Sequence, residues 1–490
     1  MPSGPIKEPI SKVDTAWLRM EQATNLMMIT GVIVLDPSVT FDAVVQTIRQ
    51  RWLAFRRFRQ KAVDRARGAY WELDEDFDIH AHVRRVALPG NAGRDELEEF
   101  VSDLASTRLD HSRPLWQFHY VENYSGGPVV VQRVHHCYAD GIALVQVFLS
   151  LTDPTPEPRP SAADPVTWTK RRMAESTIFQ RLTEPARDGL GQALHWTQKM
   201  LGEAAGIVQE PERAGKYLSE VSELGKELVN SMTLPADPPT LFKGRLGVRK
   251  RVAWAEPLPL TDVKALSKAY GCTVNDVLIA AVTGALRSYM LEQGETPSRS
   301  TEIRATVPVN LRPLEHAKNL GNHFGLVFLS LPIGEPNPVN RVRQVNARMN
   351  ELKESKQAAV AFGLLAALGM GPSALQKPAL ELLSEKATTV LTNVPGPQQP
   401  LYLAGGEVRE MMFWVPQNGG IGMGVSILSY NGKVFFGVIT DRKLVAEPQR
   451  IIKRFQPEFE NLVYLSLMLP VAEPDAGLQA TELLDTATQD

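Results

Sequence analysis

The clearest hydrophobic pattern of the chain lies between residues 129 and 150. Residues 129–134 form a valine-rich run, interrupted only by Gln132 and Arg133, whose density of β-branched residues is typical of a buried strand. The apolar residues 142–150 then fit a helix that Asp140 and Gly141 begin. His135 and His136 therefore stand at a strand-to-helix corner, where side chains can be directed into a cleft.

Two further patterns predict β-structure. Residues 115–121 alternate in the manner of a half-buried strand and lead to a turn at 123–127. Residues 425–430 and 433–439 flank Asn431-Gly432, the strongest hairpin signal in the sequence. Since helical and strand-like stretches occur on both sides of the middle of the chain, we expect mixed sheets with helices packed on them, in two halves.

The segments between these patterns differ in composition. Residues 152–160 are rich in proline and predict a semi-stiff connector, and residues 168–234 fit amphipathic helix with polar interruptions. The longest apolar stretch, residues 358–371, is shorter than the ~20 residues of a spanning helix and ends at Pro372. It fits a buried helix or an apolar surface that rests on a membrane or lipid droplet.

Composition narrows the class of protein. The chain has 490 residues, 43% of them apolar, and a formal net charge of −2. A chain of this length can hold two cores, because single cores stop growing near ~250–300 residues. The apolar content excludes a disordered chain, and the charge gives no global reason to expect nucleic-acid binding. With two cysteines, Cys137 and Cys272, and no export signal at the start, neither a disulfide scaffold nor export is expected.

The His-His-x-x-x-Asp-Gly corner favours proton-transfer chemistry. Imidazole has an ordinary pKa of about 6.5, which suits a general base near neutral pH. Neighbouring strand residues face opposite ways, so one histidine can reach a substrate while the other packs. Asp140 either orients the imidazole, as in a catalytic triad, or turns away and holds the corner through an arginine pair. A histidine with a purely structural role is the competing interpretation.

Other chemistries fit the corner less well. Adjacent histidines on a strand cannot easily bind one metal ion, and Cys137 is too close in sequence to His136 for a nucleophile–base pair. The chain has no Gly-x-Ser-x-Gly nucleophile elbow. The glycines at 420, 422 and 424 lack the dinucleotide-binding spacing and instead predict a turn or a close backbone approach.

The residues 135–141 resemble the HHxxxDG signature of CoA-dependent acyltransferases and peptide-synthetase condensation domains. Further stretches narrow the resemblance to the bacterial wax ester synthase/diacylglycerol acyltransferase family. They are Val13–Glu21, Arg113–Trp116, Thr273–Leu278, Val307–Arg312, Gly321–Gly325 and Thr392–Pro397. These stretches are spread from the N-terminus to beyond residue 390. The resemblance therefore covers nearly the whole chain, apart from about Thr152 to Pro239.

The resemblance implies an α/β (α+β) fold of two chloramphenicol-acetyltransferase-like lobes, with mixed sheets, flanking helices and an interlobe tunnel that has the histidine near its middle. We expect an N-terminal lobe at 1–151 and a proline-rich, helical linker at 152–240. A C-terminal lobe at 241–475 and a flexible tail at 476–490 complete the expected division.

The resemblance also implies an O-acyltransferase. It transfers a fatty acyl group from acyl-CoA to diacylglycerol, to a long-chain fatty alcohol, or to both, and makes triacylglycerol or wax ester. His136 is the expected general base, and His135, Asp140 and Gly141 complete the catalytic set. Asn275, Glu21 and Arg312 are the expected substrate-binding or positioning residues.

No cofactor and no metal are expected, since acyl-CoA is a substrate. The expected location is cytoplasmic, at the inner face of the cell membrane or on lipid inclusions, with peripheral contact to membrane or lipid droplet and no nucleic-acid partner. Two other functions stay open: a condensation-like acyltransferase that uses a carrier-protein thioester, and a non-catalytic lipid-binding or droplet protein.

Several residues keep a simpler alternative. Asn275 can cap the helix that starts near residue 276, Glu21 can be an exposed carboxylate, and Arg133 competes with Arg312 as the partner of Asp140. Residues 392–397 fit a shaped loop or a plain turn.

The densest group of basic residues is a further feature that the sequence leaves open. It suits the phosphates of CoA, an anionic membrane or a solvated face. The residues are Lys243, Arg245, Arg249, Lys250 and Arg251.

Overall fold

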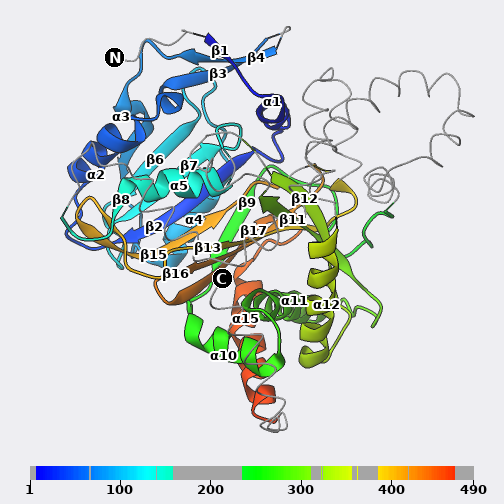
Figure 1. Cartoon of the computed structure of the whole chain (residues 1–490). Helices are drawn as coiled ribbons and strands as arrows, with labels where there is room; N and C mark the ends of the chain where they lie inside the picture. Colours follow the sequence, from blue (N-terminus) through cyan, green and yellow to red (C-terminus); the bar gives the residue numbers. More distant parts are fainter. Residues whose placement is uncertain are drawn as a thin grey trace, which may run out of the picture.

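The computed structural model describes residues 7–65, 68–139, 141–157, 234–310, 322, 324–355, 361, 384–417 and 419–468. Three sheets and their helices form two lobes packed on one another (Figure 1). The expected helical linker, the apolar stretch 358–371 and the expected tail lie almost wholly outside the described residues.

The first lobe contains a seven-stranded sheet with the order β5-β6-β7-β2-β15-β14-β8. Its strands are β2 (Met28–Leu35), β5 (Val83–Val86), β6 (Trp116–Val121), β7 (Val129–His135), β8 (Thr152–Asp153), β14 (Tyr402–Leu403) and β15 (Gly406–Trp414). Strand β5 runs parallel to β6, and the other pairs are antiparallel. The valine-rich run is therefore a strand, as predicted, and it lies in the middle of the sheet.

Helices and a small sheet complete the first lobe. The helices are α1 (Lys12–Arg19), α2 (Phe41–Thr47), η1 (Ile48–Trp52), η2 (Arg56–Arg59), α3 (Ile79–His82), α4 (Arg94–Ala105) and α5 (Gly141–Leu151). The small sheet has the order β1-β4-β3, from β1 (Lys7–Pro9), β4 (Gly68–Leu73) and β3 (Gln60–Arg65). Helix α5 confirms the helix predicted after the histidines.

The second lobe has a seven-stranded mixed sheet with the order β10-β17-β16-β13-β11-β12, and β9 also pairs with β17. The strands are β9 (Lys250–Trp254), β10 (Leu258–Pro259), β11 (Ile303–Asn310), β12 (Phe324–Leu331), β13 (Thr389–Pro395), β16 (Met423–Tyr430) and β17 (Lys433–Asp441). Strands β11, β13 and β16 are parallel. The predicted hairpin is confirmed: β16 and β17 pair across Asn431 and Gly432, which both have positive φ, as the tight turn requires.

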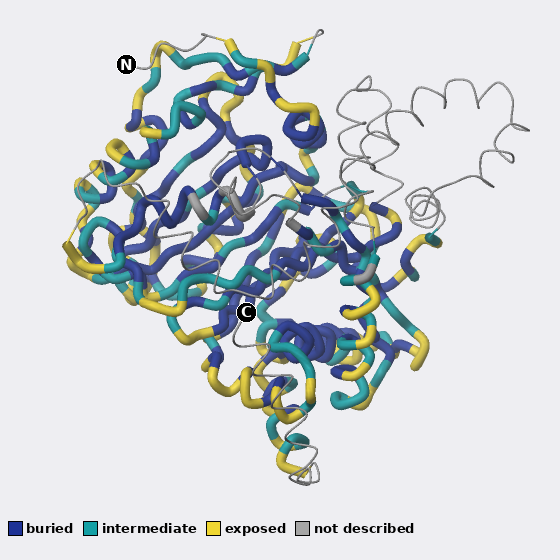
Figure 2. Tube along the Cα trace, viewed as in Figure 1, coloured by how far each residue is buried: buried dark blue, intermediate teal, exposed yellow. Residues whose placement is uncertain are grey.

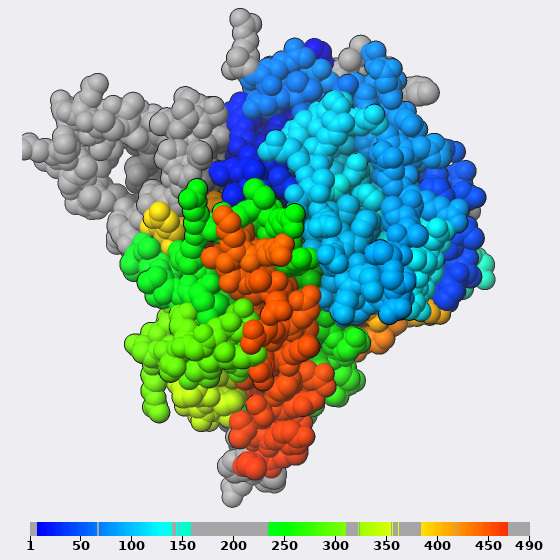
Figure 3. Space-filling view, turned by 180° about the vertical axis from the view of Figure 1, so that it is seen from behind, coloured from blue at the N-terminus to red at the C-terminus, as the bar shows by residue number. Residues whose placement is uncertain are grey.

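Four helices cover one face of the second sheet: α10 (Leu260–Tyr270), α11 (Val274–Glu292), α12 (Pro338–Glu354) and α15 (Gln449–Ser466). Helix α11 is buried over most of its length (Figure 2). Seen from behind, α15 runs along the second lobe beside the first (Figure 3). No single described helix is long and apolar enough to cross a bilayer, although the bent pair α10 and α11, at 98°, meets the length and composition test together.

The opposite face of the second sheet packs on the first lobe. Val309, Phe324, Leu428 and Phe435 belong to the same buried apolar cluster as the strands of the first sheet. The chain also crosses between the lobes, because β14 and β15 come from residues 402–414 yet pair in the first sheet. The expected division into lobes at 1–151 and 241–475 stays a prediction. Strands β14 and β15 belong by sequence to the second range but pair in the sheet of the first lobe.

A hydrogen-bonded seam joins α4 of the first lobe to β9 of the second. The Glu98 carboxylate accepts from the backbone N–H of Trp254 (3.4 Å), Ser102 Oγ accepts from Val252 (3.0 Å), and Ser106 Oγ accepts from Lys250 (2.7 Å). The acceptors recur every four residues on one helix face, and the donors recur every two residues along a strand. The two periods match, so side chains of α4 satisfy an edge that would otherwise be unpaired.

Candidate active site

Strand β7 ends at the histidine pair and is held there from both sides. His135 pairs with Met28 of β2, and the backbone N–H of His136 donates to the carbonyl of Met27 (2.7 Å). Two residues later, the Tyr138 hydroxyl accepts from the backbone of Leu115 and donates to the carbonyl of Gln60. The corner is therefore a fixed part of the first lobe.

The two histidines face opposite ways, as the strand pattern predicts. The His135 side chain is 1% exposed, and its Nδ1 accepts from the backbone N–H of Cys137 (3.1 Å). In the neutral ring this bond places the proton on Nε2. Burial lowers the His135 pKa to about 3, with the nearby charges of His111, His136 and Arg108 acting in the same direction. His135 is thus a neutral packing histidine at working pH.

The His135 ring points toward a charged cluster around Glu21. Its Nε2 lies 3.9 Å from Glu21 Oε2. The same carboxylate bonds His111 Nε2 (2.6 Å) and Arg108 Nε (2.9 Å). The Glu21 side chain is only 6% exposed. The interpretation of Glu21 as a plain exposed carboxylate is therefore wrong: it ties the turn after α1 to the loop between α4 and β6, next to the histidine pair.

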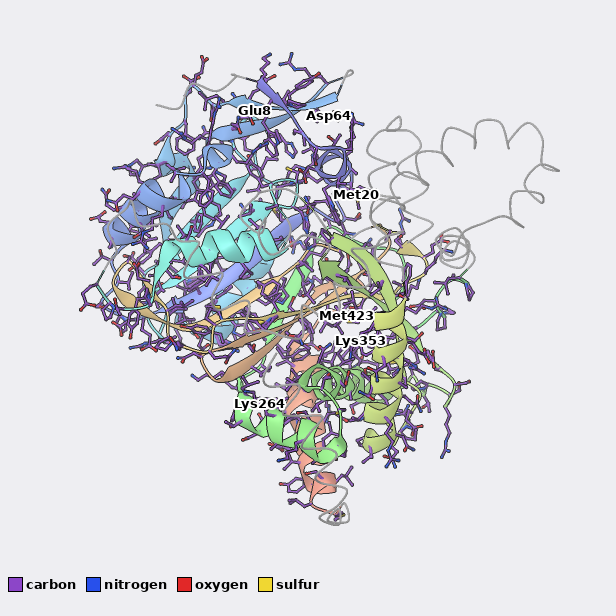
Figure 4. The ribbon with its side chains drawn as sticks, in the orientation of Figure 1. Glu8, Met20, Asp64, Lys264, Lys353 and Met423 are labelled. Carbon is purple, nitrogen blue, oxygen red and sulfur yellow. The ribbon has the colours of Figure 1, made fainter. Side chains whose placement is uncertain are left out.

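The His136 ring lies on the other side, among aromatic residues. It stacks on Trp17, with ring centroids 4.4 Å apart and planes at 23°, and Phe324 lies 5.6 Å away. His136 is 4% exposed. Trp17 comes from α1 and Phe324 from the start of β12, so both lobes contribute to the surroundings of this ring. Figure 4 labels Met20, the residue at which α1 ends.

A buried amide ties the second lobe to the backbone of His136. Asn322 Nδ2 donates to the His136 carbonyl (2.8 Å) and to Asp14 Oδ1 (2.7 Å), and the Asn322 backbone N–H donates to the same Asp14 oxygen (2.8 Å). Asp14 is 5% exposed, and Asn322 is 2% exposed. Asp14 and Trp17 are three residues apart on α1 and hence share its face. This helix and Asn322 set the position of the corner from outside β7.

Asn275 does not cap its helix, so that interpretation is wrong. The N-cap is Thr273, which forms a capping box with Asp276. Asn275 lies in the first turn of α11, and its Oδ1 accepts from Asn393 Nδ2 (2.6 Å). This bond orients the Asn275 amide, since its oxygen must face β13.

The segment predicted as a loop or turn at 392–397 is mostly strand. Residues 392–395 belong to β13, and only the residues after Pro395 leave the strand. Of the glycines predicted to mark a turn or a close backbone approach, Gly420 lies in a turn, and Gly422 and Gly424 are closely approached by side chains. An added Cβ on Gly424 would lie 2.8 Å from the Gln417 side chain, and one on Gly422 would lie 2.5 Å from that of Leu444.

Three predicted site features are not located by the described residues. Asp140 and Arg312 lie outside them, and of Gly141 the structure gives only its place at the start of α5. The described hydrogen bonds of Arg133 go to the carbonyls of Leu104 and Thr107 and to Gln117, so a pairing of Arg133 with Asp140 stays a prediction.

The described residues bear on metal binding and on cysteine chemistry. Among the described residues, no group of three or more histidine, cysteine or acidic side chains is placed to bind a metal ion. Cys137 is fully buried, and burial raises its pKa well above the ordinary value. A thiolate nucleophile at this position is therefore disfavoured.

Comparison with known proteins identifies the family. The model of the wax ester synthase/diacylglycerol acyltransferase catalytic domain matches residues 10–278, and the model of the C-terminal domain of the same family matches residues 320–463. The chain belongs to this family. Two Mycobacterium tuberculosis relatives, named probable diacylglycerol O-acyltransferases tgs1 and tgs2, are 28% and 30% identical to it. The tgs1 match covers 93% of this chain and 96% of the relative, and the tgs2 match covers 80% and 83%.

Solved structures of the family and of a related class share the fold. The wax ester synthase/diacylglycerol acyltransferase from Marinobacter aquaeolei VT8 matches with a TM-score of 0.65 and 22% identity, over 94% of this chain and 100% of that one. The first condensation domain of the calcium-dependent antibiotic synthetase matches with a TM-score of 0.56 and 14% identity, over 95% and 97%. The predicted two-lobed acyltransferase fold is confirmed, and the interlobe tunnel stays a prediction.

The motifs of the wax ester synthase/diacylglycerol acyltransferase family contain site residues that the sequence did not single out. Asp14 and Trp17 lie in the motif that ends at Glu21, Asn322 and Phe324 lie in the Gly321–Gly325 motif, and Asn393 lies in the Thr392–Pro397 motif. Their membership of these motifs was the available signal. His111 and Arg108 had no such signal, because only the folded chain brings them to Glu21.

Proposed function

We propose that this protein transfers a fatty acyl group from acyl-CoA to the hydroxyl of diacylglycerol, of a long-chain fatty alcohol, or of both. The observation that carries the proposal is the setting of His136, a buried imidazole stacked on Trp17 beside Phe324, with its backbone held by Asn322. Membership of the family and the names of the mycobacterial relatives support the same reaction.

The reaction needs a base and no covalent enzyme intermediate. His136 removes the proton of the lipid hydroxyl as that oxygen attacks the thioester carbonyl. The C–S bond then breaks, and the imidazolium returns the proton to the departing CoA thiolate. One proton thus travels from alcohol to thiol through His136, and no water is consumed. The aromatic neighbours favour an apolar acceptor and limit competing hydrolysis.

The oxyanion formed during the attack needs a hydrogen-bond donor, and Trp17 offers one. Its Nε1 is buried and has no hydrogen-bond partner among the described residues. A buried donor without a partner costs about 1–3 kcal/mol, and such a group is stabilised when a substrate oxygen accepts from it. Asn275 is the second candidate, because Asn393 fixes the direction of its amide. Either residue would stabilise developing charge without reorganising.

His135 and Glu21 support His136 from behind rather than touch the substrate. The neutral His135 ring keeps a second positive charge away from the imidazolium that forms on His136. Glu21 places a negative charge on the far side of that ring, held by Arg108 and His111. Asp140, Gly141 and Arg312 keep the catalytic and positioning roles that the family motif suggests.

We further propose a cytoplasmic, peripheral location at the inner face of the cell membrane or on lipid inclusions. The support is chemical, because the acceptor lipids are insoluble and the enzyme must meet them at a surface. The reaction as written uses acyl-CoA as a substrate and calls for no cofactor.

The test is acceptor-dependent release of CoA thiol from palmitoyl-CoA, with hexadecanol or dioleoylglycerol as acceptor and the lipid products identified by mass spectrometry. We expect wax ester or triacylglycerol in amounts equal to the thiol released. Thiol release that does not respond to either acceptor would favour the carrier-protein or the non-catalytic alternative.

A further inference from the structure

The densest basic stretch of the sequence separates into paired and unpaired residues in the fold. Lys250 is buried and pairs with Asp441 (3.1 Å), and Arg251 lies 4.0 Å from Glu99. Lys243 Nζ donates to backbone carbonyls, among them that of Ala387. Arg245 and Arg249, in contrast, are exposed. They form no ion pair within the part of the chain that the structure describes.

A second loop adds two more cations beside them. Arg442 and Lys443 follow β17 and are both exposed. The backbone N–H of Arg442 donates to the carbonyl of Arg249 (2.9 Å), and the Lys443 side chain passes over Gly247, where an added Cβ would lie 3.1 Å from it. We name Arg245, Arg249, Arg442 and Lys443 the cationic surface.

The acidic group of these loops lies beneath the cationic surface and does not neutralise it. Asp441 is fully buried, and its carboxylate accepts from Lys250 Nζ and from the backbone N–H groups of Gly247 (2.9 Å) and Lys443 (3.0 Å). It therefore ties the two loops into one rigid surface, while its charge is matched by Lys250. Among the residues that the structure describes, the four exposed cations have no ion-pair partner.

An aliphatic side chain stands among these cations. Val248, between Arg245 and Arg249 in the chain, is 55% exposed, and few large apolar residues of the described chain are as exposed. Cations that surround an exposed aliphatic group match the headgroup region of a bilayer, where phosphates bind the cations and the acyl boundary takes the apolar group. We propose that the cationic surface docks this protein on anionic phospholipids.

Docking at this surface fits the proposed function, on which its purpose rests. The backbone N–H of Lys250 donates to Ser106 Oγ at the end of α4. Two residues further on, Arg108 binds Glu21 behind the histidine pair. The cationic surface thus lies beside the seam between the lobes. Through Ser106 it is connected to the loop that carries Arg108 and supports the catalytic corner. A membrane bound here delivers insoluble acceptor near the seam.

The test compares the double variant R249Q/R442Q with the wild type in co-sedimentation with phosphatidylcholine vesicles that contain one third phosphatidylglycerol. Each cation near an anionic surface contributes about 1 kcal/mol, so two of them predict binding about 30-fold weaker. Binding should also weaken in high salt, which screens exposed charges. The V248S variant should bind more weakly without any change in the salt dependence.

The control variant K264Q/K268Q removes the same charge from the exposed face of α10. Pro259, just before α10, pairs with Lys433 at the start of β17, whereas Lys250 pairs with Asp441 at its end. The two sites are therefore separated by about 27 Å of strand. Lys264 and Met423, which pairs with Thr440 near the cationic surface, lie well apart in Figure 4. We expect the control to bind vesicles as the wild type does.

Three results would overturn the proposal: equal vesicle binding by R249Q/R442Q and wild type, equal losses in both double variants, or a raised KM for palmitoyl-CoA in R249Q/R442Q with unchanged vesicle binding. The last would assign the surface to the phosphates of CoA. Turnover with detergent-dispersed acceptor separates this proposal from the proposed function. R249Q/R442Q should keep wild-type turnover there, whereas a wild type that binds vesicles but never turns over would contradict the proposed function alone.

Discussion

Replacement of Asn322 by alanine should weaken catalysis without unfolding the protein. The change removes two side-chain hydrogen bonds, one to the His136 carbonyl and one to Asp14 Oδ1, and leaves the backbone bond to Asp14. Each lost bond costs about 0.5–1.5 kcal/mol, or 1.5–3 kcal/mol where the partner is charged. The sum is about 2–4 kcal/mol, which lies within the stability of most domains.

The catalytic effect follows from position rather than from contact. Asn322 bonds the backbone of His136, so the loss of its side chain lets the imidazole move relative to the lipid hydroxyl and the thioester carbonyl. A misplacement of about 1 Å costs roughly 100-fold in rate. We therefore expect kcat to fall about 10- to 100-fold with KM changed by less than about threefold, since the side chain is not assigned to substrate binding.

The assay is steady-state CoA-thiol release with a saturating acceptor, beside a urea unfolding curve for each variant. The matched control is N350A, because Asn350 lies on the exposed side of α12 and its side chain bonds only neighbours on the same helix, Asn346 at 3.5 Å and Lys353 at 3.0 Å. An N322A enzyme with kcat within about twofold of the wild type would refute the argument that Asn322 positions His136. So would an equal loss in N350A.

Three further predictions follow from other contacts. The His135 pKa of about 3 lies below its ordinary 6.5, so the unfolded chain binds a proton that the folded chain does not, and stability falls as pH drops from 6.5 toward 3. In urea unfolding measured against pH, the stability that wild type loses between neutral pH and pH 5 should be about 2 kcal/mol smaller in H135N. N393A should lower kcat/KM as much as N275A, about 10-fold, and the double variant should add little, whereas additive losses would show that the two amides act independently. E98L leaves the Trp254 N–H without its acceptor and should destabilise the protein by about 1–3 kcal/mol, with E98Q closer to wild type. Equal midpoints of urea unfolding for E98L and wild type would contradict the role of the α4–β9 seam.

Local patterns in the sequence were enough to predict the elements that carry the histidines. The valine run, the helix after it and the Asn431-Gly432 hairpin depend on neighbouring residues, and all three are confirmed. The opposite directions of His135 and His136 also follow from the period of a strand. Residues 392–395 were wrongly predicted as a loop or turn and form part of a strand. Proline and glycine suggest a loop when the parallel pairing with β16 is not known.

Contacts between distant segments could not be predicted in the same way. Glu21 reaches Arg108 and His111 across about 90 residues of sequence, and Asn322 reaches His136 from 186 residues away. No periodicity encodes such pairs, since they depend on how segments far apart in the sequence pack in three dimensions. The cap at Thr273 was missed for a local reason: both Thr273 and Asn275 are good capping residues, and only the capping box with Asp276 separates them.

The central claim is that His136 transfers the proton in a direct reaction between acyl-CoA and the lipid hydroxyl. The most direct measurement is acceptor-dependent CoA-thiol release by H136A and wild type, at matched folded concentration, with detergent-dispersed dioleoylglycerol or hexadecanol and with a no-acceptor control. The account predicts that H136A loses at least about 100-fold of the acceptor-dependent rate, the lower end of the usual contribution of a general base. It also predicts that wild type releases no burst of thiol without acceptor. An H136A enzyme that keeps the wild-type rate, or a stoichiometric burst without acceptor, would contradict it.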